Sequence, residues 1–443
     1  MPDFTPHTDE EIELMLEACG LSSVEELFTA IPEALRLAGG LDMAPGLSEP
    51  DVVVETQRLA AGNPGAELIC FAGCGAYDHE VPAAVRRLAF RSEFVTAYTP
   101  YQPEVAQGVL QMLFEYQTLV ARLAGVPVAN ASLYDGASAL VEATNLAVAA
   151  TKRSTVWVSE GIHPTWREVL RTFAKGTGHE LVSVPLRNGV TVWPDAVGEP
   201  PAAVLIGQPN HLGCIEDVRA AADLVHGLGG LCVVAADPVA AGLLRSPGEL
   251  GADVVVGEGQ PFGTPMSFGG PYVGLFASTM EQVRRLPGRL VGETVDTEGR
   301  RAYVTTLRAR EQDIRREKAS SNVCTNQTLI AVAFAIQLSW LGTAGLRELA
   351  LRCARGTRYC REALLAIDGV EPLADAPVLR EFSLKLPVAP RTVVERLAEE
   401  GFLAGVPLEP GQHQPEGLAV AVTERRTRGE IDAFAAAFEK AVR

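Results

Sequence analysis

The residues with the clearest chemical meaning surround a Gly- and Pro-rich turn at residues 257–272. A short buried strand, residues 253–256, is predicted before the turn, and a second strand, residues 270–276, after it. Large α/β proteins bind ligands in the crevice outside the carboxyl ends of their strands, and this turn follows such an end. Other polar groups are predicted at nearby ends of strands and helices. They are the carboxylates of Asp135 and Asp237, the hydroxyl of Ser138 and the unobstructed backbone of Gly136.

Three of the four parts of a pyridoxal phosphate (PLP) site have counterparts among these residues. Asp237 ends a predicted strand, where an acidic residue would pair with the pyridinium nitrogen. Asp135–Ser138 begins a predicted helix, and the N–H groups and dipole of a helix start bind phosphate. His163 or Tyr134 offers a ring to stack on the cofactor. Ordinary N-capping is the alternative role of Asp135–Ser138.

The fourth part, the lysine that forms the imine, is missing. Gly259-Gln260-Pro261 stands where it is expected, and glutamine cannot form an imine. The chain has only five lysines, with none between Lys175 and Lys318, and Lys318 comes too late in chain order. The sequence therefore predicts a PLP-type scaffold that does not bind PLP covalently. In this scaffold Gln260, Asp237 and Asp135–Ser138 are vestigial cofactor positions with structural roles.

Two polar segments elsewhere are candidates for a site. Prolines stiffen the loop at residues 98–104, and Pro103 is predicted to open a helix that runs to about Ala124 and ends at Gly125. The loop suits the placement of polar groups in a site, and a surface loop with packed tyrosines is an equal alternative. The run 308–327 changes from charged to hydrogen-bonding residues before the apolar helix 328–341. The polar residues of the loop are Tyr98, Tyr101, Gln102 and Glu104.

The elements that must position these residues predict an α/β fold. Apolar strands at 155–158, 181–184, 203–206, 231–236 and 253–256 alternate with helices, which indicates a mostly parallel sheet covered on both faces. We expect an N-terminal helical arm at 1–65, a large α/β domain at 66–330, and connecting helices with a small α+β domain at 331–443. Helix caps are predicted in the arm at Thr8 with Glu11, at Ser23 with Glu26, and at Ser48.

Composition limits the partners. The 443 residues are 47% hydrophobic and 21% charged, with a formal net charge of −17. That charge argues against nucleic acid and anionic membrane as partners. The eight cysteines form no Cys-x-x-Cys pair, so we expect reduced thiols and no metal site. With no signal peptide and no sufficiently long uncharged apolar run, we expect a cytoplasmic protein.

Three segments carry long and unusual motifs: Thr96-Ala-Tyr-Thr-Pro-Tyr-Gln-Pro-Glu-Val-Ala-Gln-Gly108, Gly257-Glu-Gly-Gln-Pro-Phe-Gly-Thr-Pro-Met-Ser-Phe-Gly-Gly-Pro-Tyr272 and Glu317-Lys-Ala-Ser-Ser-Asn-Val-Cys-Thr-Asn-Gln327. They resemble the glycine decarboxylase P-protein family, and more narrowly the first subunit of its two-subunit bacterial form, glycine dehydrogenase (decarboxylating). The resemblance covers essentially the whole chain.

The resemblance implies an aminotransferase-like fold (fold type I) and a role in the glycine cleavage system. In such a pair, subunit 2 carries the PLP lysine, decarboxylates glycine and passes the aminomethyl group to the lipoyl arm of H-protein. Subunit 1 is its degenerate twin, so a missing lysine is expected. The implied assembly is an α2β2 heterotetramer with the working site near the subunit interface.

Under this resemblance, the loop with Tyr98, Tyr101, Gln102 and Glu104 is predicted to reach the active site of the partner. A second set is predicted to line the interface or a substrate channel. Two other classes of function remain open: a stand-alone PLP aminotransferase or decarboxylase that uses an out-of-place lysine, and a non-catalytic scaffold. The second set consists of Asn322, Cys324, Thr325 and Asn326.

Overall fold

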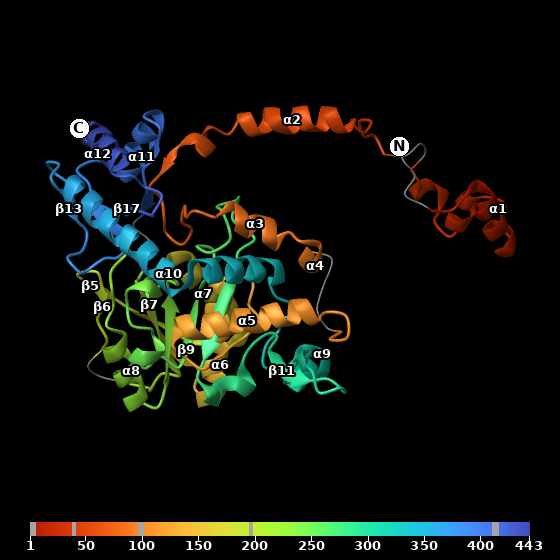
Figure 1. Ribbon diagram of the computed structural model, residues 1–443, viewed down its shortest axis with the longest axis horizontal. Coiled ribbons are helices and arrows are strands. Elements are labelled where there is room, and N and C mark those ends of the chain that lie inside the picture. The colour runs from red at the N-terminus through yellow and green to blue at the C-terminus, as the bar shows by residue number, and fades with distance from the viewer. Residues whose placement is uncertain (1–5, 38–40, 96–101, 195–197, 410–415) are drawn as a thin grey trace. The chain divides into compact units, whose positions relative to one another are not determined.

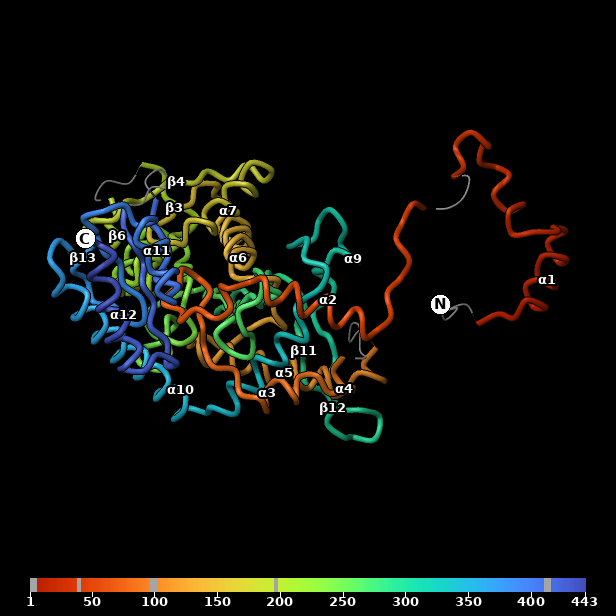
Figure 2. The backbone as a smooth tube through the Cα atoms, turned by 90° about the horizontal axis from the view of Figure 1, so that it is seen from above, coloured from red at the N-terminus to blue at the C-terminus, as the bar shows by residue number. Residues whose placement is uncertain are grey.

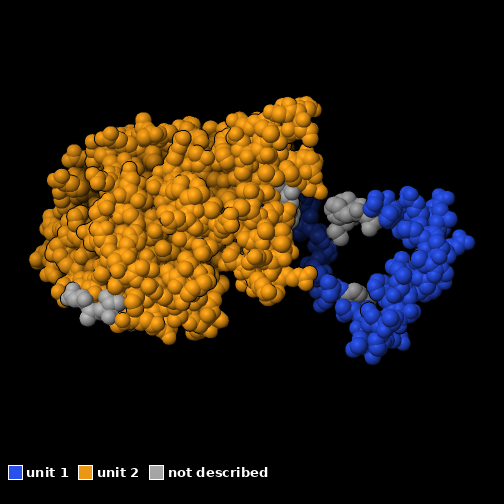
Figure 3. All heavy atoms as spheres, turned by 90° about the horizontal axis from the view of Figure 1, so that it is seen from below, with its two compact units in different colours: residues 1–64 blue, residues 65–443 orange. Residues whose placement is uncertain are grey.

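The computed structural model describes residues 6–37, 41–95, 102–194, 198–409 and 416–443. The chain divides into two compact units, residues 1–64 and residues 65–443 (Figure 3). In unit 1 the structure describes two α-helices and two 3-10 helices and no strand. They are α1 (Asp9–Ala18), η1 (Val24–Phe28), η2 (Glu33–Leu35) and α2 (Glu49–Ala61).

The predicted helix starts of unit 1 are confirmed at two of three positions. Thr8 and Glu11 form a reciprocal capping box at the start of α1. The hydroxyl of Ser48 accepts the N–H of Asp51 and caps α2. The prediction at Ser23 is wrong: its side chain makes no cap hydrogen bond, and η1 is a 3-10 helix. Ser22 contacts the Glu26 carboxylate instead.

The centre of unit 2 is a seven-stranded, mostly parallel sheet, as predicted. Five neighbouring strands are parallel, and β10 runs antiparallel to both of its neighbours. The order across the sheet is β2 (Val128–Ala129), β10 (Gly274–Ser278), β9 (Val254–Glu258), β8 (Leu231–Ala236), β7 (Ala203–Gln208), β3 (Thr155–Ser159) and β4 (Glu180–Val184).

Helices cover both faces of this sheet (Figure 1). Alternate residues of a strand point to opposite faces, so Val204 and Ile206 of β7 join one core cluster, whereas Ala203 and Leu205 join another. The first cluster includes side chains of α5 (Gln107–Ala124), α8 (Val218–Gly227) and α10 (Thr328–Leu365). The second includes side chains of α6 (Gly136–Thr151) and α7 (Pro164–Thr177).

The boundaries of two helices differ from the sequence prediction. Pro103 lies in a turn, and α5 begins only at Gln107, although it ends as predicted before Gly125 with φ 71°. The helix α10 is interrupted at Gly342, where φ is 58° and ψ is −175°. By length and composition α10 is able to cross a membrane. Its buried side chains, however, pack in the core of unit 2 beside α5 and the sheet.

The C-terminal part of the chain builds a second sheet with its own core. Figure 2 shows α11, α12 and β13 gathered together in unit 2. The strand β1 (Ile69–Cys70) pairs in parallel with β15 (Phe402–Leu403), so an early segment packs with this late part of the chain. The elements are β13 (Glu371–Pro372), β14 (Glu381–Lys385), β17 (Gly417–Ala421), β16 (Val406–Leu408), α11 (Pro390–Glu399) and α12 (Arg428–Ala441).

The remaining elements are short. A hairpin of β11 (Val291–Val295) and β12 (Arg301–Thr305) packs beside α5, and β5 (Leu186–Arg187) pairs with β6 (Val190–Thr191). The domain boundary expected near residue 330 stays a prediction. The other helices are α3 (Ala83–Ala89), α4 (Ser92–Val95), α9 (Gln312–Arg315), η3 (Pro64–Glu67), η4 (Ala240–Gly242), η5 (Gly248–Leu250), η6 (Met280–Arg285), η7 (Arg308–Arg310) and η8 (Arg316–Lys318).

Candidate functional site

A crevice that includes charged and aromatic side chains lies at the carboxyl ends of β7, β8 and β9, where an α/β sheet binds its ligands. Its cavity is ≈ 90 Å³, which is below the roughly 300 Å³ at which small-ligand pockets begin. The crevice is narrow because side chains of distant segments fill it. Those that decide its chemistry are Tyr77, His163, Trp166, Asp237, Glu258 and Arg380.

Gln260 occupies the position expected for the imine-forming lysine and is fully buried. Its amide nitrogen donates to the carbonyls of Tyr77 and Thr264, both at 3.0 Å. Its amide oxygen accepts the Tyr77 N–H, also at 3.0 Å. Both ends of the glutamine amide are therefore satisfied by backbone groups. This pairing ties the Gly-rich bend at residues 72–79 to the turn after β9.

No lysine lines the crevice. All five lysines fall within the described ranges. Lys175 is exposed in the last turn of α7, and Lys318 is exposed at the end of η8. Neither has access to the buried turn that holds Gln260. The second class of function considered from the sequence, an enzyme with an out-of-place lysine, has no support in this geometry.

Asp237, the counterpart of the pyridinium-pairing acid, is neutralised by a side chain that the sequence did not point to. Arg380 Nε lies 2.8 Å from Asp237 Oδ2. The guanidinium carbon lies 3.5 Å from the centroid of the Tyr77 ring. Burial lowers the pKa of Arg380, but Asp237, Tyr77, Cys353 and Glu381 together outweigh that effect, so the net pKa is raised and the arginine stays charged. An acid held in this ion pair is not free to pair with a cofactor ring.

The start of α6, the counterpart of the phosphate cradle, is also filled. Asp135 caps the helix by accepting the Ser138 N–H at 2.7 Å, which confirms the capping alternative. The Gly136 N–H donates to Glu258 Oε2 at 3.0 Å, so the carboxyl group of Glu258 already occupies the place of an anion. The indole of Trp166 covers Gly136 so closely that a Cβ there would meet it at 2.2 Å.

Glu258 is held in this cradle by further backbone donors. Its Oε1 accepts the N–H of Gln260 at 3.2 Å and that of Val273 at 3.1 Å. Burial raises the pKa of Glu258 to about 7, and the backbone N–H groups of Gly136, Val273 and Gln260 oppose that rise. A phosphate at this helix start would have to displace both the carboxylate and the Trp166 ring.

These three observations test whether the crevice fits PLP. The lysine position is a glutamine, the acid is paired with Arg380, and the helix start is covered by Glu258 and Trp166. The residues of this chain therefore do not fit the cofactor. The vestigial positions named from the sequence lie together in the fold, and they are bonded to one another or to backbone rather than open to a ligand.

The two rings considered as stacking partners have different surroundings. His163 lines the crevice, where its Nε2 lies 2.7 Å from the carbonyl oxygen of Cys74 and its Nδ1 accepts the Thr165 N–H. Burial lowers the pKa of His163. The Tyr134 hydroxyl instead accepts the Cys324 N–H at 3.2 Å, away from the crevice lining.

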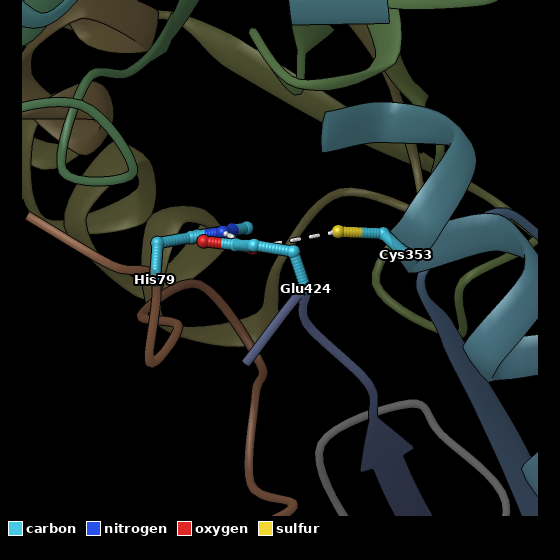
Figure 4. A group of neighbouring side chains, drawn as sticks. All are labelled: His79, Cys353 and Glu424. Atoms are coloured by element: carbon cyan, nitrogen blue, oxygen red, sulfur yellow. Dashed lines mark hydrogen bonds and ion pairs between the residues drawn. The ribbon is translucent and has the colours of Figure 1, made fainter. Parts of the chain in front are cut away.

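A buried chain of charges continues from Arg380. Its guanidinium contacts His79 Nε2, and His79 Nδ1 lies 2.6 Å from Glu424 Oε2 (Figure 4). Cys353 of α10 approaches the same oxygen at 3.7 Å. His79, Cys353 and Glu424 have metal-ligand chemistry, but both ring nitrogens of His79 are already used and the cation of Arg380 adjoins them. We interpret the group as a structural charge network.

The titration of Glu424 agrees with that interpretation. Burial alone would raise the pKa of this carboxyl group. The hydrogen bond from His79, with the Glu80 N–H, lowers it to about 2. Glu424 is thus ionised and held at the end of the chain that begins with Asp237. Glu381 adds a third acid, accepting the Cys74 N–H at 2.6 Å and the Tyr77 hydroxyl at 2.9 Å.

The loop predicted to enter a site lies only partly in the described chain. Tyr98 and Tyr101 lie outside the described residues. Gln102 and Glu104 are exposed in the turn before α5, and neither lines the crevice. Their predicted role toward a partner is therefore untested.

The second predicted set lies beside the loop that leads into α6. Asn326 Nδ2 donates to the Ala131 carbonyl at 2.6 Å, while Asn322 and Cys324 are exposed and Thr325 is half-buried. These residues do not line the crevice either. Their role at an interface or channel stays a prediction.

Sequence reasoning missed most of the residues that fill the crevice. Arg380 follows Asp237 by more than a hundred residues and comes from the segment before β14, so no local pattern joins the two. In the sequence, Trp166 fits the apolar side of a helix and Glu258 fits the end of a strand. Neither pattern indicates a site residue. The one signal that could have found part of this filling is the Gly-rich segment 72–79, which contains Tyr77, because glycines allow close approach of the backbone.

Comparisons with known proteins agree over the full length. A profile of the family described as "Glycine cleavage system P-protein" matches residues 2–438. Two relatives bear the name "Probable glycine dehydrogenase (decarboxylating) subunit 1", one from Desulforamulus reducens and one from Moorella thermoacetica. Each is 47% identical over 440 residues and covers 98% of this chain and 98% of its own.

The solved structures give the same picture. A crystal structure titled glycine decarboxylase (P-protein) of the glycine cleavage system, in inhibitor-bound form, is similar with a TM-score of 0.94 and 46% identity. It covers 99% of this chain and 100% of that chain. A sphingosine-1-phosphate lyase of Burkholderia pseudomallei has a TM-score of 0.67 at 16% identity, over 91% of this chain and 93% of that chain. This second likeness concerns the fold alone.

Proposed function

Because the chain belongs to the glycine cleavage system P-protein family, we propose that it is the PLP-free subunit of a two-subunit glycine dehydrogenase (decarboxylating). The partner subunit carries PLP and decarboxylates glycine. The aminomethyl group then passes to the lipoyl arm of H-protein. The observation that carries this proposal is the self-filled crevice, in which Gln260 replaces the lysine and every cofactor position is bonded internally.

In this proposal the chain completes the active site of the partner subunit and binds that subunit through an interface. In the proposed α2β2 heterotetramer, the loop with Tyr98, Tyr101, Gln102 and Glu104 reaches the partner's active site and positions the glycine carboxylate or the lipoyl arm. Asn322, Cys324, Thr325 and Asn326 line the interface. The exposure of Gln102, Glu104, Asn322 and Cys324 supports such roles, because a partner could reach all four residues.

The turn after β9 supports an assembled state as well. Phe268 is 101% exposed, and Met266 beside it is 41% exposed. A groove lined by apolar side chains of α3, α4 and α10 adjoins this turn. Large apolar side chains displayed together mark protein–protein contact surfaces. The partner subunit is the occupant that the family membership suggests.

The test measures glycine–bicarbonate exchange in the presence of lipoylated H-protein. This chain alone, the PLP-carrying subunit alone and the co-purified pair are compared, and the visible absorbance of lysine-bound PLP is followed in each. We expect exchange only in the pair, with the cofactor absorbance on the partner. Borohydride trapping of PLP on this chain would overturn the proposal in favour of a stand-alone enzyme. Exchange by the partner alone at the full rate would favour the scaffold.

Two substitutions test the loop. Tyr101→Phe and Glu104→Ala are expected to lower the exchange rate of the pair at least tenfold while assembly is unchanged. Glu395→Ala, an exposed residue of α11, is the matched control and is expected to leave the rate unchanged. If both loop variants assemble and work normally, the loop has a structural role only.

A further inference from the structure

We propose that a groove between α10 and α12 is a binding site for a small phosphorylated molecule, which is held by arginines of both helices. The two helices pack against one another through a shared core cluster, which includes Cys360 and Leu364 of α10 and Ile431 and Phe434 of α12 (Figure 1). The groove opens beside that contact in unit 2. This site lies outside the proposed function, because it needs neither PLP nor a partner subunit.

The first observation is the size and the charge of the groove. Its cavity is ≈ 490 Å³, which lies within the roughly 300–1,000 Å³ of pockets that bind small molecules. Glu424 is the only acid among the described residues that line it. The whole chain has a formal net charge of −17, so a gathering of cations at one place is a local feature that attracts anions. The lining cations are Arg352, Arg355, Arg426 and Arg428.

The second observation is that the arginines on the α10 wall keep their charge available. Arg355 is exposed and makes no hydrogen bond or ion pair with the part of the chain that the structure describes. Arg352, three residues before it on the same helix face, shares only an exposed ion pair with Glu348. Such exposed pairs are weak and leave the guanidinium open to a ligand. The Glu424 carboxylate is already bound to His79 Nδ1 at 2.6 Å.

The α12 wall presents a guanidinium that is held in position by an aromatic ring. Arg428 Nε donates to the Tyr359 hydroxyl at 3.3 Å, and its guanidinium carbon lies 5.1 Å from the centroid of that ring. The phenol in turn donates to Asp432 Oδ1 at 2.6 Å. A neutral phenol positions the cation without neutralising it, so Arg428 faces the groove as a charged donor.

The third observation is a buried guanidinium nitrogen that lacks an acceptor. The side chain of Arg426 is 6% exposed, and its Nε has no hydrogen-bond partner within the described chain. Its Nη2 lies 3.1 Å from Asp78 Oδ2, but Arg425 contacts the other oxygen of the same carboxylate, so two cations share one acid. Buried donors are normally satisfied, and an unsatisfied one indicates a missing ligand. Because Arg426 lines the groove, an anion bound there supplies the acceptor.

These contacts identify the class of ligand. Guanidinium groups bind phosphate oxygens through paired N–H donors, and cations on both walls suit a group with more than one negative charge. A phosphate ester carries about −1.5 to −2 at pH 7, whereas a carboxylate carries a single charge. Thr427 caps α12 at this groove, where the helix dipole favours the same sign of charge. Tyr359 and Ile431 offer apolar surface to the rest of the molecule.

The test measures binding of AMP, a phosphate ester of suitable size, to the full-length chain by calorimetry and phosphorus NMR. Arg355→Gln with Arg428→Gln removes one exposed cation from each wall. The matched control is Arg358→Gln with Arg391→Gln. It also removes one exposed cation from α10 and one from the first turn of a helix, here α11, and neither residue lines the groove.

We expect one AMP to bind per chain and the groove variant to raise its dissociation constant at least tenfold. Adenosine, which lacks the phosphate, should bind at least tenfold more weakly than AMP, and inorganic phosphate should displace AMP. Added salt should weaken binding, because the arginines are screened. The control variant stays within twofold of wild type. All the substituted side chains are exposed, and thermal melting verifies that the variants remain folded.

Four results overturn the proposal. The first is that wild type does not bind AMP, and the second is that adenosine binds as tightly as AMP. The third is that the groove variant binds AMP within twofold of wild type. The fourth is that AMP binds the chain alone but not its complex with the PLP-carrying subunit, which would make the groove part of an interface.

A protein ligand is distinguished by the exchange assay. If AMP does not bind and the groove variant instead raises the KM for H-protein, the groove docks a protein and the proposal is wrong. Failure of this proposal leaves the proposed function intact, because exchange by the wild-type pair does not depend on AMP. Failure of the proposed function likewise leaves AMP binding by the chain unchanged, so the two are tested separately.

Discussion

The crevice of unit 2 and the helices of unit 1 are opposite in how their side chains are satisfied. In the crevice, Asp237, Arg380 and Glu258 are buried or nearly so, and each is paired with another group of the same chain. In unit 1 most of the large apolar side chains are exposed and the described part has no buried residue. The place where this fold usually binds a ligand is built like a finished core. The described part of unit 1 has specified helix starts but no core of its own.

The largest effect should come from breaking the charge chain of the crevice. Arg380→Met leaves Asp237 buried without its cation and removes the guanidinium from the Tyr77 ring. Breaking a buried ion pair costs about 3–5 kcal/mol of unfolding free energy. The measurement is urea unfolding followed by tryptophan fluorescence. All four tryptophans, Trp157, Trp166, Trp193 and Trp340, lie in unit 2.

The double variant separates loss of the pair from loss of packing. Arg380→Met with Asp237→Leu removes both charges, and replacing both members of a buried pair by apolar groups is often nearly neutral. We expect it to be more stable than Arg380→Met alone. Arg352→Ala, which breaks an exposed pair with Glu348, is the control and is expected within about 0.5 kcal/mol of wild type. Equal losses for the single and double variants would contradict the charge argument.

A slightly smaller effect should appear as a pH dependence. The folded-state pKa of Glu258, about 7, lies above its ordinary value of 4.5, so the folded protein holds a proton that the unfolded chain releases. Its contribution to stability is full below the ordinary value and is lost as pH rises through about 7. Between these limits the wild type should lose about 3 kcal/mol relative to Glu258→Gln, which does not titrate.

The measurement for Glu258 is the unfolding free energy of both proteins across neutral pH. Parallel curves for the wild type and Glu258→Gln would mean that the three backbone donors hold the carboxylate ionised throughout. That result would make the cradle a permanently occupied anion site. It would leave the geometric argument against a second anion in place.

Restoring the missing lysine tests whether the filled crevice of unit 2 can bind PLP. Gln260→Lys is expected to give no visible absorbance of lysine-bound PLP and no borohydride-trapped cofactor in this chain. The reason is that Glu258 and Trp166 still cover the helix start, and Arg380 still holds Asp237. The variant should also lose about 1–3 kcal/mol of stability, because the backbone groups of Tyr77 lose their partner. The PLP-carrying subunit is the positive control.

The sequence predicted the parallel strands, the missing lysine and two helix caps, but it did not predict what fills the crevice. Buried apolar runs identified the parallel strands, the absence of lysine after β9 identified the lost cofactor anchor, and local patterns gave the caps at Thr8 and Ser48. Those signals lie within a few residues of the feature they predict. The start of α5 at Gln107 rather than Pro103, and the loss of the Ser23 cap, show that even local signals compete with turns and neighbouring hydroxyls.

The filling of the crevice depended on contacts that no local pattern contains. Arg380 reaches Asp237 from another part of the chain, and Gln260 pairs with the backbone of Tyr77, 183 residues away in sequence. Such contacts are decided by the folded packing of strands and bends. A single sequence therefore revealed which group was missing from the site, and only the structure revealed what had taken its place.

The smallest expected effect on the unfolding free energy comes from removing a helix cap in unit 1. Ser48→Ala removes the cap of α2, which in a helix coupled to a core would cost about 1 kcal/mol. In the isolated chain we expect a change of less than about 0.5 kcal/mol in the tryptophan-reported unfolding. Unit 1 has no described buried residue through which to couple to that transition. A full loss of 1 kcal/mol in the isolated chain would instead show that α2 already folds as part of unit 2.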